Sequence, residues 1–358
     1  MNGFRALFGE AEQRFISAVQ GLRGLAALSV VVTHLYAMPY LANLTPPTFP
    51  QWAHLSLATG GRGVELFFII SGYLIPASLV RHRVLSQFFR DRALRIMPVF
   101  VILHLALFTI GPLVGYKFFP SLDAISYIRV FLSNLFFVPE LFGDPVAQQN
   151  AWTLTYEWAF YIWFAAVFAL VARGWWIAAV PLVLMAIVLA GFFPLLTYFG
   201  LGMVMASQRI RLPLGGWVGA CLAIIALIAM YYLCEYVTPY AGLVPAAIVF
   251  ALVLSPGSGF AQLLESRALQ FVGKISYSLY LVHPFVLFPL VVIAKRAFAH
   301  GVDPWAILGA FALTGAVASI LVAAVSYELV EVRLRRVLQR FLAGPPKATI
   351  GGPVQEQG

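Results

Sequence analysis

The chain has 358 residues, of which 61% are hydrophobic and only 10% are charged, and its mean hydropathy is +0.89. These values exclude an ordinary soluble domain and predict an all-α, polytopic bundle of transmembrane helices. The formal net charge of +9 fits Lys- and Arg-rich cytoplasmic loops and indicates no nucleic-acid partner. Cys221 and Cys234 form no CxxC motif and no cluster with histidine, so neither a disulfide nor a metal site is indicated.

Ten apolar stretches are expected to cross the membrane. Most have the twenty or so residues that a bilayer requires, whereas the sixth and the eighth are short. The expected spans are residues 18–38, 63–80, 96–115, 151–172, 174–193, 194–208, 214–234, 241–256, 271–293 and 305–329. The first residues contain no short apolar core followed by a cleavage site, so we expect no removable signal peptide.

Basic segments at alternate ends of these spans fix the expected orientation. They are Arg5 to Arg14, Arg81 to Arg95, Arg173, Arg209 with Arg211, and Arg333 to Arg336. All of them face the cytoplasm if both termini are cytoplasmic, whereas Lys295 and Arg296 then lie at an outer end. The expected organisation is a cytoplasmic segment 1–16, a transmembrane domain 17–330, and a cytoplasmic tail 331–358 that is basic and then, from Gly344, disordered.

The first span, GLRGLAALSVVVTHLYAMP, carries Arg23 and His34 eleven residues apart. Eleven steps of about 100° bring the second side chain back to within roughly 20° of the first, so both lie on one helix face. The rise between them is about 16 Å, roughly half of the hydrocarbon thickness. Such residues are costly inside a membrane and suggest a function, although a snorkelling arginine and a histidine bonded to a neighbouring helix fit the pattern as well.

Two carboxylates are expected at a depth similar to that of His34. Glu65 lies at the outer start of the second span, and Glu157, in AWTLTYEWAFYIW, lies a turn or two inside the outer end of the fourth. A carboxylate beside a histidine raises its basicity and fixes its tautomer, which is what a general base needs. A buried polar network that only ties helices together is the structural alternative, and Glu65 at a span end could simply be solvated.

A basic cluster precedes the third span on the cytoplasmic side. In QFFRDRALRIMP, Arg92 and Arg95 are one helical turn apart and face the same way. Paired guanidinium groups suit a phosphate-bearing ligand, because each binds phosphate oxygens in a bidentate manner. Contact with lipid headgroups is the common alternative for a basic loop. Arg23 falls on the same side, so a phosphate-bearing donor inside and a base further out predict chemistry across the membrane.

The longest outer connection, residues 116–150, contains the apolar stretch ISYIRVFLSNLFFVPELF. This stretch fits an interfacial helix, a re-entrant segment or an additional span. An additional span would invert everything after it and place Arg173, Arg209 and Arg211 outside. We therefore expect the interfacial or re-entrant arrangement.

The chain resembles the acyltransferase 3 family of integral-membrane acyltransferases from about residue 16 to residue 330. The resemblance rests on five segments in the family's order, QGLRGLAALSVVVTHL, GRGVELFFIISGYLI, FFRDRALRIMP, AWTLTYEWAFYIW and ISYSLYLVHPFV. The family's Arg-x10-His pattern falls on Arg23 and His34, and its Arg-x-x-Arg pattern on Arg92 and Arg95. Its other site positions are matched by Glu157, by His283, and by Glu65 in place of the family's aspartate.

The resemblance implies an acyl-CoA donor bound from the cytoplasm, without a cofactor or metal, in a bacterial inner membrane. The acyl group, usually acetyl, is passed to a hydroxyl of a carbohydrate or glycolipid, with His34 as general base and Glu157 holding its tautomer. Arg23 then binds the CoA phosphates or stabilises developing negative charge, and Glu65 and His283 support the site. Direct attack and an acyl-histidine intermediate both stay open.

A proton-coupled transporter is the competing class, with His34 and Glu157 as a proton relay and the basic loop recognising an anionic substrate. The chain shows no two halves of similar hydropathy, which weighs against a transporter built from repeats. A third hypothesis is an enzyme that acts on a lipid acceptor inside the membrane. The residues alone do not identify the acceptor.

Overall fold

The computed structural model describes residues 13–82 and 84–343, and within this range the chain forms helices and connecting loops without a β-strand. Residues 1–12 of the predicted segment 1–16, Arg83 and the tail from Gly344 lie outside the described residues. The helices are α2 (Gln13–Leu41), α3 (Gln51–Thr59), α4 (Gly63–His82), α5 (Leu85–Ile110), α6 (Ala124–Leu135), α7 (Trp152–Ala172), α8 (Trp176–Phe192), α9 (Leu196–Gln208), α10 (Gly216–Tyr236), α11 (Leu243–Val253), α12 (Gly259–Leu264), α13 (Arg267–Ala299), α14 (Pro304–Ser326) and α15 (Arg335–Ala343). Short 3₁₀ turns lie at Gly60–Arg62, Phe119–Ser121, Pro139–Phe142 and Pro239–Gly242, and Tyr327–Leu334 is π-helical.

Each of the ten expected spans overlaps a helix of the described chain, although α5 runs from Leu85 to Ile110 where the sequence predicted a span over 96–115, so that Arg92 and Arg95 lie within the helix and not before it. Seven helical stretches are long and apolar enough to cross a membrane: Ser17–Leu41, Gln51–His82, Leu85–Ile110, Trp152–Ala172, Gly216–Tyr236, Arg267–Ala299 and Pro304–Leu342. The helices at the fifth, sixth and eighth expected spans are α8, α9 and α11, with 17, 13 and 11 residues. The protein is therefore an all-helical, multi-pass membrane protein.

The last helix runs past residue 330, where the sequence predicted the start of the tail. It continues from α14 through the π-helical turn Tyr327–Leu334 into α15. Glu331 accepts a hydrogen bond of 2.6 Å from the hydroxyl of Ser278 on α13. Residues beyond 330 therefore belong to the packed helical body, at least as far as this contact.

The long connection after α5 folds back along that helix. Its helix α6 has 12 residues, or about 18 Å, which is too short to cross the hydrocarbon layer. The hydroxyl of Tyr127 on α6 donates to the carbonyl of Phe108, and the ring of Phe131 lies 4.7 Å from that of His104 on α5. These contacts agree with the interfacial or re-entrant arrangement.

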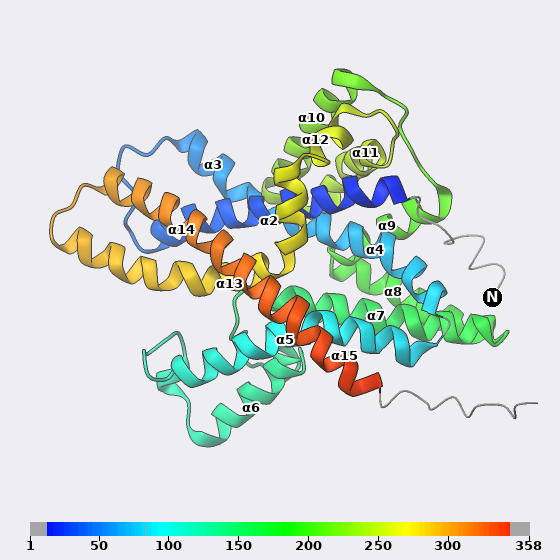
Figure 1. The fold of residues 1–358 in the computed structure, drawn as a ribbon, viewed down its shortest axis with the longest axis horizontal. Helices are drawn as coiled ribbons and strands as arrows, with labels where there is room; N and C mark the ends of the chain where they lie inside the picture. The colour runs from blue at the N-terminus through cyan, green and yellow to red at the C-terminus, as the bar shows by residue number, and fades with distance from the viewer. Residues whose placement is uncertain (1–12, 83, 344–358) are drawn as a thin grey trace, which may run out of the picture.

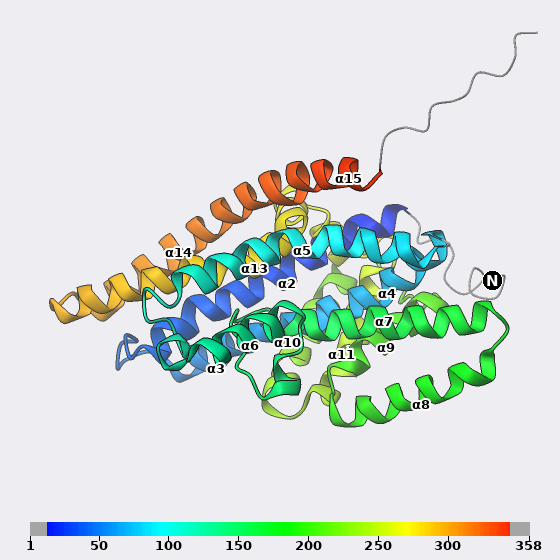
Figure 2. The same cartoon turned by 90° about the horizontal axis from the view of Figure 1, so that it is seen from below.

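The turns that carry the basic segments gather at one end of the molecule. The start of α2, the α4–α5 turn, the α7–α8 turn and α15 all lie in the right-hand half of both views (Figures 1 and 2). The α13–α14 turn and the α5–α6 connection lie at the opposite end. This arrangement separates Lys295 and Arg296, in the last turns of α13, from most of the other basic segments.

Helices α2 and α13 cross at glycines that allow their backbones to approach closely. A Cβ atom on Gly273 would lie 2.1 Å from the carbonyl oxygen of Gln20, and one on Gly24 would lie 2.6 Å from that of Leu269. Membrane helices use such small residues because apolar side chains gain little from leaving lipid, so close packing must hold the helices together. The crossing fixes the positions of every side chain that α2 and α13 contribute to the interior.

We expect Gly273→Ala to lower the free energy of unfolding in detergent by about 1–3 kcal/mol, because the added methyl meets backbone atoms that cannot rotate away. Thermal unfolding of the purified variants measures this effect. Gly309→Ala on α14 is the matched control, since a Cβ there meets nothing within 4 Å and alanine favours the helix by up to about 1 kcal/mol. Equal melting temperatures for Gly273→Ala and wild type would contradict the close crossing.

Candidate functional site

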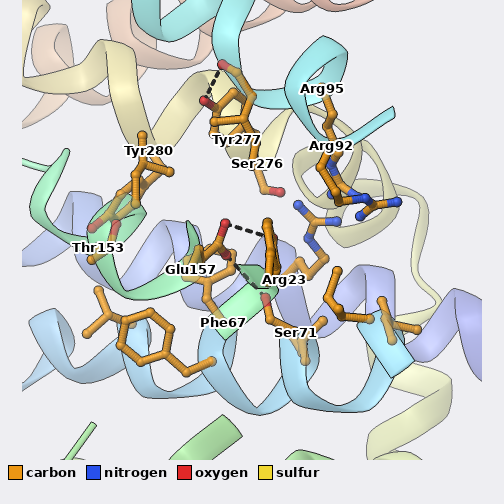
Figure 3. A pocket seen from close by; sticks show the side chains of 18 residues that line it. Arg23, Phe67, Ser71, Arg92, Arg95, Thr153, Glu157, Ser276, Tyr277 and Tyr280 are labelled. Carbon is orange, nitrogen blue, oxygen red and sulfur yellow. Dashed lines mark hydrogen bonds between the residues drawn. The ribbon is translucent and has the colours of Figure 1, made fainter. Parts of the chain in front are cut away.

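A cavity lies among α2, α4, α5, α7 and α13 (Figure 3). Its polar lining comes from five helices and from segments far apart in the sequence: Arg23, Ser71, Arg92, Arg95, Thr153, Glu157, Tyr161, Ser276, Tyr277 and Tyr280. Apolar side chains such as Phe67, Phe68 and Ile96 fill the wall between these groups. The cavity therefore combines an apolar envelope with a few converging polar groups, as small-molecule sites usually do.

Three arginines reach this cavity from two helices. Arg23 comes from α2, and Arg92 and Arg95 come from successive turns of α5. None of the three forms an ion pair within the described part of the chain; Arg92 makes only a long hydrogen bond of 3.4 Å to the hydroxyl of Ser78. The Nε atom of Arg92 is buried without a hydrogen-bond partner there, as is the hydroxyl of Ser276. These groups leave donors available for an anionic ligand.

The carboxylate of Glu157 shares the cavity with the arginines. It accepts hydrogen bonds from the hydroxyl of Ser71, at 3.1 Å, and from the hydroxyl of Tyr161, at 3.0 Å. The sequence instead suggested His34 as the partner of Glu157, and no hydrogen bond or ion pair between the two occurs among the described residues. Three guanidinium groups around one carboxylate give the cavity a net positive charge, which suits phosphate.

His34 is paired with the imidazole of His283, not with a carboxylate. Its Nδ1 lies 3.3 Å from Nε2 of His283 and 2.9 Å from the carbonyl oxygen of Val30. Nδ1 of His283 lies 2.8 Å from the carbonyl oxygen of Leu279. A carbonyl only accepts, so both Nδ1 atoms carry the proton, and Nε2 of His283 is the acceptor for His34.

This pattern leaves Nε2 of His34 as an unprotonated nitrogen without a hydrogen-bond partner among the described residues. His34 is half-buried, whereas His283 is completely buried, at 0% exposure. A neutral imidazole whose Nδ1–H is held by acceptors presents the lone pair on Nε2, the form that a general base requires. His283 therefore fixes the tautomer of His34, a role that the sequence analysis assigned to a carboxylate.

Pro284 explains why Asn150 joins this pair. A proline has no N–H, so the carbonyl of Tyr280, four residues earlier on α13, loses its helical donor. The side-chain amide of Asn150 supplies that donor at 2.7 Å and also lies 3.4 Å from Nε2 of His283. His283 itself is held by the carbonyl of Leu279, one turn earlier on the same helix.

Tyr280 connects the cavity to the histidine pair. It lines the cavity, and its ring centroid lies 6.4 Å from that of His283, which in turn lies 4.9 Å from that of His34. Arg92 and Arg95 lie on one side of the cavity, and Tyr280 and Thr153 lie on the opposite side (Figure 3). The cavity thus has a guanidinium end and a tyrosine end, and the histidines follow the tyrosine end.

Glu65 is neither solvated nor paired with His34. Its side chain is fully buried, and Oε1 lies 3.4 Å from Nη1 of Arg62, which also forms a 2.7 Å ion pair with Glu235 on α10 through Nε. The 3₁₀ turn that carries Arg62 packs on α2, where it brings Gly60 and Gly63 against Ser29. The contacts therefore place Glu65 in an ion-pair network that ties α4 to α10.

Several site residues were not singled out from the sequence. Four of them lie within the segments that resemble the family: Ser71, Tyr161, Tyr277 and Tyr280. They carry no charge, so their position inside a membrane helix is not costly and did not mark them as functional. Asn150 lies in the polar run QQN directly before the fourth expected span. A polar run next to an apolar helix was the feature of the sequence that could have identified it as a site residue. Residues 13–82 and 84–343 contain no group of three or more His, Cys, Asp or Glu side chains that could hold a metal ion.

Comparisons with known proteins give a family match over most of the chain. A family model described as an acyltransferase domain matches residues 16–325. The exopolysaccharide production protein ExoZ of Rhizobium meliloti is 30% identical over 326 residues, which cover 83% of this chain and 95% of that protein. The acyltransferase MdmB of Streptomyces mycarofaciens is 29% identical over 316 residues, which cover 76% of this chain and 79% of that protein.

A third relative is longer than this chain. The O-acetyltransferase OatA of Staphylococcus aureus is 23% identical over 402 aligned positions, which cover 96% of this chain and 61% of OatA. No solved structure matches the chain. The family model and ExoZ together decide the assignment: the chain belongs to the acyltransferase 3 family of membrane-bound acyltransferases.

Proposed function

We propose that this protein is an O-acyltransferase of the bacterial inner membrane. It moves an acyl group, in the first instance acetyl, from cytoplasmic acyl-CoA to a hydroxyl of a cell-surface or exported carbohydrate. The observation that carries the proposal is the cavity where Arg23, Arg92 and Arg95 converge and whose far end, at Tyr280, adjoins the His34–His283 pair. The names of ExoZ and OatA support a saccharide acceptor and an acetyl group.

The three arginines hold the phosphates of the donor. Each guanidinium offers a planar pair of N–H donors that matches two phosphate oxygens, and a CoA nucleotide carries several such oxygens. With the phosphates at the guanidinium end, the thioester arm extends along the apolar wall toward Tyr280. Glu157 limits the positive charge of the cavity and orients Ser71 and Tyr161, both of which donate to it.

His34 is the general base of the transfer. Its Nε2 takes the proton of the acceptor hydroxyl while the hydroxyl oxygen attacks the thioester carbonyl carbon. The C–S bond then breaks, and the thiolate of CoA takes the proton back from the imidazolium. Each turnover thus forms one ester and one free thiol and leaves the histidine neutral.

His283 and Asn150 act as positioning residues. Nε2 of His283 accepts from Nδ1–H of His34, which holds the imidazole in one tautomer and lets it share the charge of the imidazolium. Asn150 in turn fixes His283 and the carbonyl that Pro284 leaves without a donor. In this family member, a second imidazole therefore takes the orienting role that was expected of Glu157.

We expect His34→Ala to lower kcat/KM for acyl transfer by about 10²- to 10⁴-fold, because a general base contributes that much to such a reaction. Radiolabelled acetyl-CoA and a glycan extract of the source bacterium give the rate. His300→Ala is the matched control, since His300 is exposed at the end of α13 and lies outside the cavity. Wild-type transfer by a correctly folded His34→Ala protein would remove His34 from the chemistry.

Arg92→Ala and Arg95→Ala should each weaken acyl-CoA binding about ten- to a hundredfold, the loss expected for one charge-assisted contact. Lysine at either position should restore only part of the affinity, because its ammonium lacks the planar fork. Calorimetry on the purified variants measures the dissociation constants. The control is Arg173→Ala, which removes an exposed arginine at the end of α7.

Equal donor affinity in wild type, Arg92→Ala and Arg92→Lys would exclude the arginine cavity as the phosphate site. Full replacement by lysine, with loss only in alanine variants, would instead indicate a role in topology or lipid contact. Both outcomes are independent of the transfer rate, so they test the donor site separately from the base.

A further inference from the structure

A second, larger cavity lies outside the arginine site, between the end of α5 and the second half of α13. This α5–α13 groove is lined by α5 from Ala106 onward, the turn at residues 111–116, residues 147–149 and α13 from Pro284 to Arg296. Twelve residues of helix separate Pro284 from Arg296, or about 18 Å. The groove is long enough for an extended ligand.

A buried amide without a partner faces this groove. Gln148 is 2% exposed, and both its Oε1 and its Nε2 lack hydrogen-bond partners within the described chain. Its backbone is held on both sides, because Asn134 accepts from the N–H of Ala147 and Asn150 bonds to α13. Buried amides are normally satisfied, so a fixed and unpaired one indicates a ligand with polar groups.

The far end of the groove carries a free cation. Arg296 is exposed and forms no ion pair within residues 13–82 and 84–343. It lies in the last turns of α13, at the end of the molecule opposite most of the basic segments. Its side chain leans back along the helix toward the groove, as helical side chains do. A guanidinium in this position suits a phosphate on the outer side of the membrane.

The wall between these two polar points is apolar and open to lipid. Ile110, Val114 and Ile293 line the groove and are 55%, 60% and 60% exposed. Tyr116 closes the groove against Phe288, with ring centroids 4.6 Å apart. Burial raises the pKa of Tyr116 to about 12, so its hydroxyl keeps its proton and can donate a hydrogen bond at neutral pH.

The inner end of the groove adjoins the histidine pair through two separate segments. Pro284 lines the groove and directly follows His283, and Gln149 lines it and directly precedes Asn150, which contacts His283. A ligand held at Gln148 would therefore lie next to the two segments that hold His283, the partner of the proposed base. The groove is separate from the arginine cavity, because no residue lines both.

We propose that the α5–α13 groove binds the acyl acceptor, and that this acceptor is a sugar joined through a phosphate to a hydrocarbon chain. The hydrocarbon chain lies along the apolar wall, Arg296 binds the phosphate, and the amide of Gln148 bonds sugar hydroxyls next to His34 and His283. This inference rests on the proposed function for the direction of transfer, although binding itself does not depend on it.

Binding of a defined probe to the full-length protein in lipid nanodiscs tests the proposal. The probe is farnesyl phosphoglucose, and the comparison ligands lack one part each: farnesyl phosphate, glucose 1-phosphate, and a farnesyl glucoside without phosphate. We expect farnesyl phosphoglucose to bind at least tenfold more tightly than any of the three. An equal amount of phosphatidylglycerol should compete weakly, because it lacks the sugar.

Two variants separate the contacts. Arg296→Ala should weaken farnesyl phosphoglucose about ten- to a hundredfold and leave the phosphate-free glucoside unchanged. Lys295→Ala is the matched control, because it removes the adjacent charge on the same turn but Lys295 does not line the groove. Gln148→Ala should abolish the preference for farnesyl phosphoglucose over farnesyl phosphate. If this substitution of a buried residue impairs folding, Arg296→Ala, which changes an exposed residue, still tests the proposal.

Equal binding of farnesyl phosphoglucose and phosphatidylglycerol, or equal effects of Arg296→Ala and Lys295→Ala, would overturn the proposal and assign the groove to ordinary membrane lipid. Acetyl-CoA binding and thioester hydrolysis are measured on the same samples. If the wild-type protein binds the probe but neither binds acetyl-CoA nor hydrolyses its thioester, the proposed function is wrong and the acceptor groove stands. Intact acetyl-CoA binding and hydrolysis without probe binding would defeat the acceptor groove alone.

Discussion

The close crossing of α2 on α13 is the constraint on which the rest of the site depends. Helix α2 supplies Arg23 and His34, and α13 supplies Tyr277, Tyr280 and His283. The 3.3 Å contact between the two imidazoles lies ten residues further along both helices than the close approach at Gly24 and Gly273. Larger residues at the crossing would move the cavity and the histidine pair together, because both are built on the same two helices.

Charge sets the second constraint. An arginine inside a membrane is costly, by about 2.5–3.5 kcal/mol at the bilayer centre and by less toward either surface, and three of them line this cavity. Two carboxylates act on these charges: Glu157 within the cavity, and Glu331, which attracts Arg23 and Arg95 from outside its lining. A cavity filled by water or by an anion removes most of this cost, which explains why the arginines converge on a hollow rather than on packed side chains.

The sequence predicted the helices and the residue types of the site well, but it misjudged one partnership. Depth along each helix follows from counting residues, so Arg23, Arg92 and Arg95 were expected on one side and His34 further out; in the structure the three arginines line one cavity, and His34 does not line it. Counting does not give the direction in which a neighbouring helix faces, so Glu157 was expected beside His34 although it lies with the arginines. Asn150 and Gln148 lie in a non-helical return segment, where no periodicity predicts position; the polar run marks them in the sequence, but their partners come from tertiary contacts.

The direction of the hydrogen bonds in the histidine pair has a consequence for membrane energetics. A proton that reaches Nε2 of His34 could pass through Nδ1 to His283, but the next partner in line is the carbonyl of Leu279, which accepts a hydrogen bond and cannot carry a proton onward. The chain of imidazoles therefore ends inside the protein. An enzyme that works between two sides of an energised membrane can in this way use a buried base without opening a proton leak along it.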